Sequence, residues 1–233
     1  MISIAENLKN VGQLINQAAQ LANRQPEEIT LLAVSKTRAA DELRILYQEG
    51  QRHFGENYLQ ESLEKIAALA DLQIDWHFIG PIQSNKTRAI AENFDWVHSV
   101  DRLKIAQRLA EQRPRTLPPL NICLQINISR ETSKSGCLPS EAEGLLKQIA
   151  RLPHITIRGL MAIPEATDDV IKQRTALKEM HSLFKRLQKQ HPTMDTLSMG
   201  MSGDMQIAIQ EGATMVRIGT ALFGPRPVVK RSP

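Results

Sequence analysis

A lysine at the end of an apolar run is the residue of this sequence with the clearest chemical potential. Residues 29–36 read Ile-Thr-Leu-Leu-Ala-Val-Ser-Lys, a pattern that predicts a strand buried on both faces and places Lys36 where strand becomes loop. Ligands of parallel α/β folds bind at the carboxyl ends of strands, so the Lys36 amine is a candidate nucleophile. The alternative is a solvated lysine that only closes a strand.

Two segments rich in glycine and hydroxyl groups indicate a phosphate site. They are residues 198–204, Ser-Met-Gly-Met-Ser-Gly-Asp, and residues 217–220, Arg-Ile-Gly-Thr. Glycines let the backbone approach an anion, hydroxyls donate to it, and a helix beginning near Ser202 would point free N–H groups at it. The alternative is that Ser202 is only a helix cap and that the glycines are only turns.

Further polar residues stand at the ends of predicted strands. Arg217 alternates with apolar neighbours, so it faces either the mouth of a barrel or an acid on an outer helix. Asn57, His77 and Met161 also fall near strand ends, where many converging groups suggest a binding site. Individually each has a structural explanation, as a turn residue, a core histidine and a packing residue.

Strand and helix patterns alternate eight times along the chain. An amphipathic helix is predicted over residues 2–23, before the first strand. The predicted strands span residues 29–36, 53–57, 74–80, 94–100, 119–128, 155–163, 196–200 and 214–218. The helices predicted between and after them span residues 39–48, 61–70, 86–93, 103–112, 140–150, 172–190 and 204–210. This alternation predicts an α/β fold, a single (β/α)8 TIM barrel with an extra N-terminal helix, and leaves an open doubly wound sheet as the alternative.

Length and composition bear on the number of domains, the kind of partner and the cellular location of this protein. With 233 residues, 42% of them hydrophobic, the chain is expected to form a single domain over residues 1–233, with a flexible tail at 225–233. The 29 basic residues are interspersed with 25 acidic ones, which argues against a nucleic-acid partner. No leader or membrane-length stretch is present, so we expect a cytoplasmic protein. The two cysteines have no metal-ligand spacing and are expected to be reduced.

Several of these motifs together resemble the pyridoxal phosphate homeostasis proteins. The resemblance covers nearly the whole chain and is carried by five segments, in this order: Val34-Ser-Lys36, residues 53–57, residues 76–86, residues 198–202 and residues 216–224. Proteins of this family are similar to the N-terminal barrel of alanine racemase and bind pyridoxal 5′-phosphate (PLP) through a Schiff base, with no established turnover. The resemblance therefore implies PLP as the cofactor.

Roles for individual residues follow from the resemblance. Lys36 would form the Schiff base, and Arg217 would face the pyridine nitrogen. The phosphate would be held by Ser202, Gly203, Gly219 and Thr220, and the cofactor would be lined by Asn57 and Met161. The chemistry agrees, because burial near another cation lowers the pKa of a lysine amine, and an arginine at the ring nitrogen makes the ring a poorer electron sink.

The expected function is therefore PLP homeostasis rather than catalysis. Such a protein would sequester the aldehyde, deliver it to apo PLP-dependent enzymes or answer to a regulatory protein, and so affect the balance of amino and keto acids. The alternative is a small racemase-type enzyme, which needs an acid/base group on each face of the substrate carbon. Alanine racemases supply a tyrosine base, whereas the only tyrosines of this chain are Tyr47 and Tyr58. Alanine racemases also have a second domain that forms their dimer interface, so we expect this chain to be a monomer. A partner-binding protein, or a barrel for another phosphorylated ligand, remains open.

Overall fold

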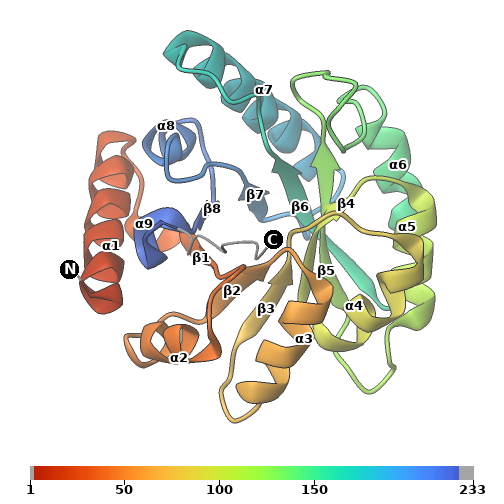
Figure 1. Ribbon diagram of the computed structural model, residues 1–233. Helices are drawn as coiled ribbons and strands as arrows, with labels where there is room; N and C mark the ends of the chain where they lie inside the picture. Colours follow the sequence, from red (N-terminus) through yellow and green to blue (C-terminus); the bar gives the residue numbers. More distant parts are fainter. Residues whose placement is uncertain (1–2, 226–233) are drawn as a thin grey trace, which may run out of the picture.

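The strands of this protein close into one parallel barrel. The computed structural model describes residues 3–225, and within them eight strands pair in sequence order, with β8 returning to β1 (Figure 1). The expected barrel is thus confirmed and the open sheet is excluded. The strands are β1 (Thr30–Val34), β2 (His53–Glu56), β3 (Asp75–Phe78), β4 (Trp96–Val100), β5 (Leu120–Ile126), β6 (Ile155–Ala162), β7 (Thr196–Ser198) and β8 (Met215–Ile218).

Helices surround the barrel on all sides, as parallel strands require crossover connections (Figure 1). The helices are α1 (Ile4–Leu21), α2 (Ala40–Gln48), α3 (Leu59–Ala68), α4 (Thr87–Asn93), α5 (Leu103–Gln112), α6 (Ala142–Ile149), α7 (Val170–Gln188), α8 (Met205–Gln210) and α9 (Thr220–Phe223). Two short 3₁₀ helices, η1 (Pro26–Glu28) and η2 (Ser84–Lys86), precede β1 and α4. Helix α9 was not expected, because its single turn leaves too short a pattern to recognise.

The expected N-terminal helix lies outside the seam between the last and first strands. Ser3 and Glu6 form a capping box at the start of α1, with the Ser3 Oγ accepting from the Glu6 N–H at 3.1 Å. Its buried face packs beside α8 and α9 (Figure 1), and the Asn7 side chain donates to the Leu222 carbonyl of α9 at 2.8 Å. Helix α1 therefore supports the part of the barrel that carries both glycine loops.

Apolar packing divides into two regions. The large core lies between the strands and the helices, where outward residues such as Ala33, Phe54 and Val216 are fully buried. A separate small cluster of Trp96, Cys123 and Met161 lies apart from this core. Branched apolar residues usually fill a barrel of this kind, so the small size of the second cluster leaves room for polar groups.

The structure also bears on the predictions for the cysteines, for the C-terminal tail and for membrane-spanning helices. Cys123 and Cys137 are buried and unpaired, and burial raises the pKa of the Cys137 thiol to about 12. Of the expected flexible tail, residues 226–233 lie outside the described residues. Among residues 3–225, no helix is both long enough and apolar enough to cross a membrane.

The close approach of β6 and β7 at Gly159 tests the packing of the barrel. A Cβ at Gly159 of β6 would lie 1.6 Å from the Thr196 carbonyl oxygen of β7, so Gly159→Ala forces two backbones apart. We expect Gly159→Ala to lower the free energy of unfolding by about 3 kcal/mol, at the upper end of overpacking costs. Urea denaturation measures the change.

The matched control for this prediction is Gly144→Ala on α6. No atom lies within 4 Å of the added methyl group there. We expect that substitution to raise the free energy of unfolding by up to about 1 kcal/mol, because alanine is the better helix former. Equal unfolding midpoints for the two variants would contradict the packing described.

Candidate functional site

Lys36 lies at the mouth of the barrel, two residues beyond the end of β1. The residue is half-buried, and the Ser35 N–H before it continues the strand pairing by donating to the Gly55 carbonyl at 3.0 Å. Thr37 after it has a φ of 63°, a left-handed conformation that is rare for a β-branched residue and costs about 1–2 kcal/mol. The backbone therefore turns sharply immediately after Lys36.

A buried lysine on α3 holds this strand end from outside. Lys65 is 5% exposed, and its Nζ donates to the Ser35 carbonyl at 2.7 Å, to Glu56 Oε1 at 2.8 Å and to Glu61 Oε1 at 2.5 Å. The Ser35 hydroxyl also donates to Glu56 Oε1, at 2.6 Å, and the Thr37 N–H donates to Glu61 Oε1, at 2.5 Å. We call Lys65, Glu56 and Glu61 the clamp, because together they fix both neighbours of Lys36.

In the clamp, the burial of Glu56 and the positive charge of Lys65 have opposite effects on the Glu56 carboxyl group. Glu56 is fully buried, and its Oε2 is a buried atom without a hydrogen-bond partner in the described part of the chain. Burial raises the pKa of Glu56, and the adjacent ammonium group of Lys65 opposes that rise. The carboxylate therefore depends on Lys65 to remain charged.

Arg217 of β8 points into the barrel rather than toward an outer helix. It is 4% exposed and donates from Nη1 to Ser198 Oγ and from Nη2 to the Ala162 carbonyl, both at 2.9 Å. Among residues 3–225, no carboxylate forms an ion pair with it. Burial lowers the pKa of Arg217 to about 10, so the group remains a cation at neutral pH. The outward alternative is thereby excluded.

The strands that carry Arg217 and Lys36 are neighbours, but the two cations lie at different heights. Arg217 is paired with Leu32, four residues before Lys36. At about 3.3 Å per residue the two Cα atoms are separated along the strand direction by at most roughly 13 Å. Lys36 therefore lies at the rim, and Arg217 lies deeper in the barrel.

The two glycine loops are adjacent at the same mouth. The Arg217 N–H donates to the Gly200 carbonyl at 3.0 Å, which ties the end of β7 to β8, and Gly200 has a φ of 94° that a side chain would resist. Within the described chain, the N–H groups of Ser202, Gly203 and Gly219 donate to no protein acceptor. These N–H groups are available to an anion.

The helix after the first loop matches the predicted range 204–210 to within one residue, but it does not begin at Ser202. Helix α8 starts at Met205 with Asp204 at its N-cap position, and the Asp204 Oδ1 accepts from the Met201 N–H at 2.6 Å. The prediction of a helix beginning near Ser202 was wrong, because serine and aspartate are equally good residues to precede a helix. Ser202, Gly203 and Thr220 are consequently exposed loop and helix-end residues rather than helix caps.

The remaining predicted residues occupy different depths. Asn57 follows β2 at the mouth, and its Oδ1 is buried without a partner among the described residues. Met161 is 1% exposed and packs with Trp96 and Cys123. Asn57 thus offers an unused acceptor, whereas Met161 shapes the barrel interior.

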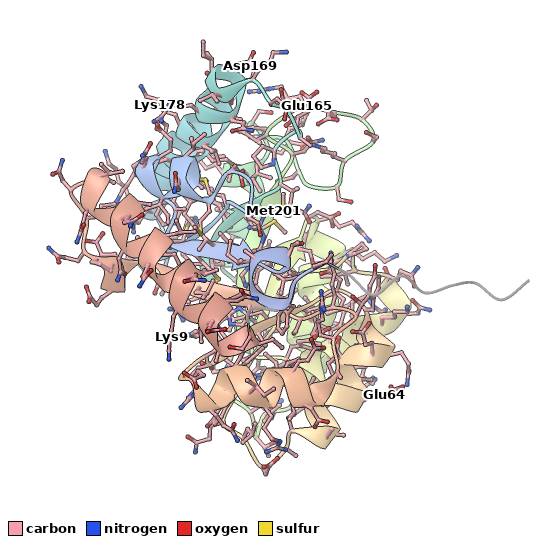
Figure 2. All side chains as sticks on the ribbon, turned by 60° about the vertical axis from the view of Figure 1, so that its left-hand side comes forward. Lys9, Glu64, Glu165, Asp169, Lys178 and Met201 are labelled. Carbon is pink, nitrogen blue, oxygen red and sulfur yellow. The ribbon has the colours of Figure 1, made fainter. Side chains whose placement is uncertain are left out.

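A cavity of about 370 Å³ opens beside the first glycine loop. Glu165 and Met201, which Figure 2 labels on segments that approach each other, line it together with Gly203 and Asp204. It lies between the connection after β6 and the connection after β7.

Sequence reasoning missed the clamp. It noted His77 as a possible core histidine but missed that His77 is joined by hydrogen bonds to the half-buried His53 and the buried His98. Lys65 stands four residues after Glu61, which signals a helical ion pair but not its burial. The histidines had no detectable spacing signal, because their contacts arise from the register of three strands.

Together, these residues fit a phosphorylated aldehyde. A lysine at the rim, free N–H groups on two loops, an unused Asn57 acceptor and a buried cation meet at one end of a closed barrel. The fold and this site define a class, the (β/α)8 barrels of the alanine racemase type. Residues 7–227 match the family model described as alanine racemase, N-terminal domain.

Similar proteins identify the family within this class of barrels. The chain is 58% identical over 226 residues to the pyridoxal phosphate homeostasis protein of Pseudomonas aeruginosa, covering 97% of each chain. It is 51% identical to the protein of that name from Escherichia coli, covering 99% of this chain and all of the other. The chain therefore belongs to the family of the pyridoxal phosphate homeostasis proteins.

Solved structures support the same fold. PipY of Synechococcus elongatus, solved with PLP bound, is 38% identical, with a TM-score of 0.81 over 95% of this chain and 100% of that chain. Alanine racemase of Corynebacterium glutamicum is 20% identical, with a TM-score of 0.67 over 98% of this chain and 62% of that one. The second likeness extends to the fold alone.

Removing the clamp cation tests its role. In Lys65→Met, the buried Glu56 carboxylate loses its counter-charge, and we expect the free energy of unfolding at neutral pH to fall by about 3–5 kcal/mol. The folded-state pKa of Glu56, already raised, then rises further above its unfolded value. The deficit should therefore shrink as pH falls and Glu56 takes up its proton in the folded state.

Lys147→Met provides the control for this prediction. Lys147 forms the same i, i+4 pair with Glu143, at 2.8 Å, but both side chains are exposed. Its loss should cost about 0–1 kcal/mol. Chemical denaturation at several pH values checks both variants, and equal losses would show that Glu56 does not depend on Lys65.

Proposed function

We propose that this protein binds PLP at the mouth of its barrel, with Lys36 as the residue that forms the Schiff base. The observation that carries the proposal is the placement of Lys36 at the same mouth as two adjacent loops with free N–H groups. The family membership and the PLP-bound relative PipY support it. In the linkage, the amine nitrogen condenses with the aldehyde carbon and one water leaves.

Each other predicted residue has a part in this proposal. Ser202, Gly203, Gly219 and Thr220 hold the phosphate, because exposed hydroxyls and unpaired N–H groups can donate to its oxygens. Asn57 lines the cofactor with its unused Oδ1 acceptor, and Met161 supports it from the barrel interior.

Arg217 sets the electronic character of the site. PLP when bound supplies an electron sink whose strength depends on protonation of its pyridine nitrogen. A guanidinium facing that nitrogen is already protonated and cannot accept its proton, and Arg217 forms no ion pair with a carboxylate in the described chain. The site is therefore suited to holding the aldehyde rather than activating it.

A role in PLP homeostasis without substantial turnover follows from these features. A racemase requires a second acid/base group opposite the lysine. The Tyr47 hydroxyl accepts from the Gln73 N–H at 3.3 Å on the outer side of α2, and Tyr58 is 52% exposed. Neither tyrosine is held as a buried base, which disfavours the racemase alternative. We further propose a cytoplasmic monomer of one domain that supplies apo-enzymes.

The absorption spectrum of the protein with PLP tests the linkage. We expect wild-type protein to show the visible band of a protein-bound Schiff base and Lys36→Ala to lose it completely. Lys134→Ala, which removes a lysine of the connection between β5 and α6, should retain the band. A band that survives in Lys36→Ala would refute Lys36, and rapid conversion of added amino acids would refute the role without turnover.

A charge reversal at the first loop tests the phosphate site separately. Ser202 is exposed, so Ser202→Asp should fold normally while its carboxylate repels the phosphate. We expect the affinity for PLP to fall about tenfold or more, a cost of about 1.4 kcal/mol or more. Pyridoxal, which lacks the phosphate, should bind both proteins equally in spectroscopic titrations. Equal losses for the two compounds would place the phosphate elsewhere.

A further inference from the structure

A column of three histidines runs through the interior of the barrel. His53 Nδ1 lies 3.1 Å from His77 Nε2, and His77 Nδ1 lies 2.9 Å from His98 Nε2. His98 Nδ1 then lies 3.0 Å from the Ser198 Oγ that accepts from Arg217. The contacts pass from β2 through β3 and β4 to β7 and β8, and they connect the first residue of β2 with the arginine beneath the mouth.

Only one assignment of donors and acceptors along the column satisfies all of its hydrogen bonds. Arg217 donates to Ser198 Oγ, and Ser198 is fully buried, so its own proton needs an acceptor. His98 Nδ1 is the acceptor that the described residues provide. His98 must then carry its proton on Nε2 and donate to His77, which for the same reason carries its proton on Nε2 and donates to His53.

Burial keeps the rings of His77 and His98 neutral. His77 and His98 are fully buried, which lowers the pKa of His77 well below its ordinary value and that of His98 to about 3. The positive charge of Arg217 adds to the effect on His98. The column can therefore change by moving protons between ring nitrogens, but not by storing a charge beside Arg217.

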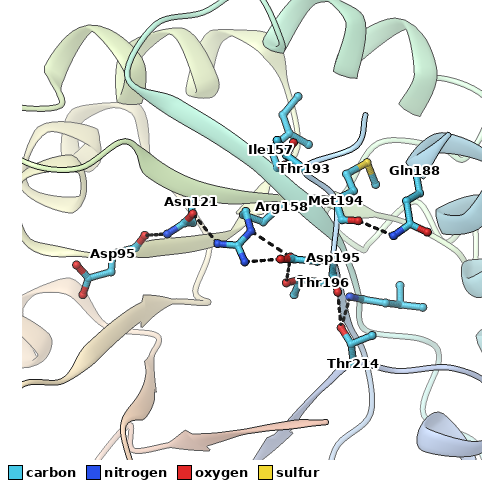
Figure 3. A network of polar contacts seen from close by, with 11 residues as sticks. Asp95, Asn121, Ile157, Arg158, Gln188, Thr193, Met194, Asp195, Thr196 and Thr214 are labelled. Carbon is cyan, nitrogen blue, oxygen red and sulfur yellow. Dashed lines mark hydrogen bonds and ion pairs between the residues drawn. The ribbon is translucent and has the colours of Figure 1, made fainter. Parts of the chain in front are cut away.

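The lower end of the column meets a cavity in the floor of the barrel. This cavity has a volume of about 240 Å³ and is lined by the first residues of several strands, among them Thr30 and His53, and by the ion pair of Arg158 and Asp195. Arg158 donates from Nε to Asp195 Oδ1 at 3.0 Å and from Nη1 to Asn121 Oδ1 at 3.1 Å (Figure 3). The charged groups of the floor are thus largely paired with each other, whereas His53 is half-buried and reachable.

His53 is the ring that can take up a proton. Its Nδ1 lies 3.5 Å from Asp75 Oδ2, which stabilises a charged ring and opposes the lowering of its pKa by burial. Glu28, Arg158 and Asp195 line the same cavity, two of them acidic and one a cation already paired with Asp195. A second proton on His53 must occupy Nδ1, where it meets the proton that His77 donates.

We propose that His53, His77 and His98 are positioning residues for Arg217, a column of neutral rings protonated on Nε2 that reverses as a unit when it takes up one proton. This uptake leaves His53 protonated on both ring nitrogens, while His77 and His98 each lose the proton on Nε2, gain one on Nδ1 and stay neutral. After reversal, His98 donates to Ser198, whose hydroxyl must turn away and accept from two donors at once. The hold on the guanidinium weakens as a result. The consequence for PLP rests on the proposed function, in which Arg217 faces the pyridine nitrogen.

Nitrogen-15 NMR of the histidine rings in protein prepared without PLP tests the column, so a failure of PLP binding cannot affect the result. Long-range proton–nitrogen correlations distinguish the two ring nitrogens, and His154, His181 and His191 serve as internal references. We expect all three column rings to be protonated on Nε2 at neutral pH. As His53 gains its second proton on acidification, the protons of His77 and His98 should move to Nδ1 at the same pH, and the Arg217 Nε–H signal should shift with them.

His53→Gln is the matched variant, because its amide oxygen can still accept from His77 but cannot titrate. In this variant His77 and His98 should stay protonated on Nε2 over the same pH range, and Arg217 should not shift. A column ring protonated on Nδ1 at neutral pH would overturn the proposal. So would His77 and His98 that keep their protons while His53 titrates, or a wild-type His53 that stays neutral until the protein unfolds.

Discussion

The interior of this barrel is organised by the burial of one guanidinium. A permanent cation removed from water costs several kcal/mol unless hydrogen-bond acceptors replace its hydration. For Arg217 these acceptors are the Ala162 carbonyl and the Ser198 hydroxyl, and Ser198 in turn requires His98. One buried charge therefore dictates polar residues on several strands, in a region that branched apolar side chains fill in most barrels of this fold.

A second buried charge, on the outer side of the sheet, fixes the rim. Lys65 makes three charge-assisted hydrogen bonds at 2.5–2.8 Å, each worth about 1.5–3 kcal/mol. The left-handed conformation of Thr37 costs only about 1–2 kcal/mol. The clamp opposes the strain of the turn, and Lys36 lies between two residues that the clamp holds in place. The guanidinium shapes the barrel from within, and the clamp shapes its rim from outside.

The sequence was informative wherever a local pattern decides the structure. All eight strands and the position of Lys36 just beyond β1 follow from apolar runs and their boundaries. The side on which Arg217 lies could not be predicted, because alternation defines two faces and only closure of β8 onto β1 decides which is interior. Lys65 on an amphipathic helix looks exposed until its buried partner Glu56, on a different element, is known. The histidine contacts depend on strand register, which no single segment specifies.

The two ends of the proposed cofactor site differ in rigidity, and that difference bears on how a ligand would leave. Arg217 and the residues around Lys36 are embedded in hydrogen-bonded, buried networks, whereas Ser202, Gly203 and Thr220 lie exposed on short connections. Segments with few buried contacts open at lower free energy than packed strands do. A phosphate held at the exposed side can be released without disturbing the barrel. Storage and delivery require such reversibility, whereas catalysis on a retained cofactor does not.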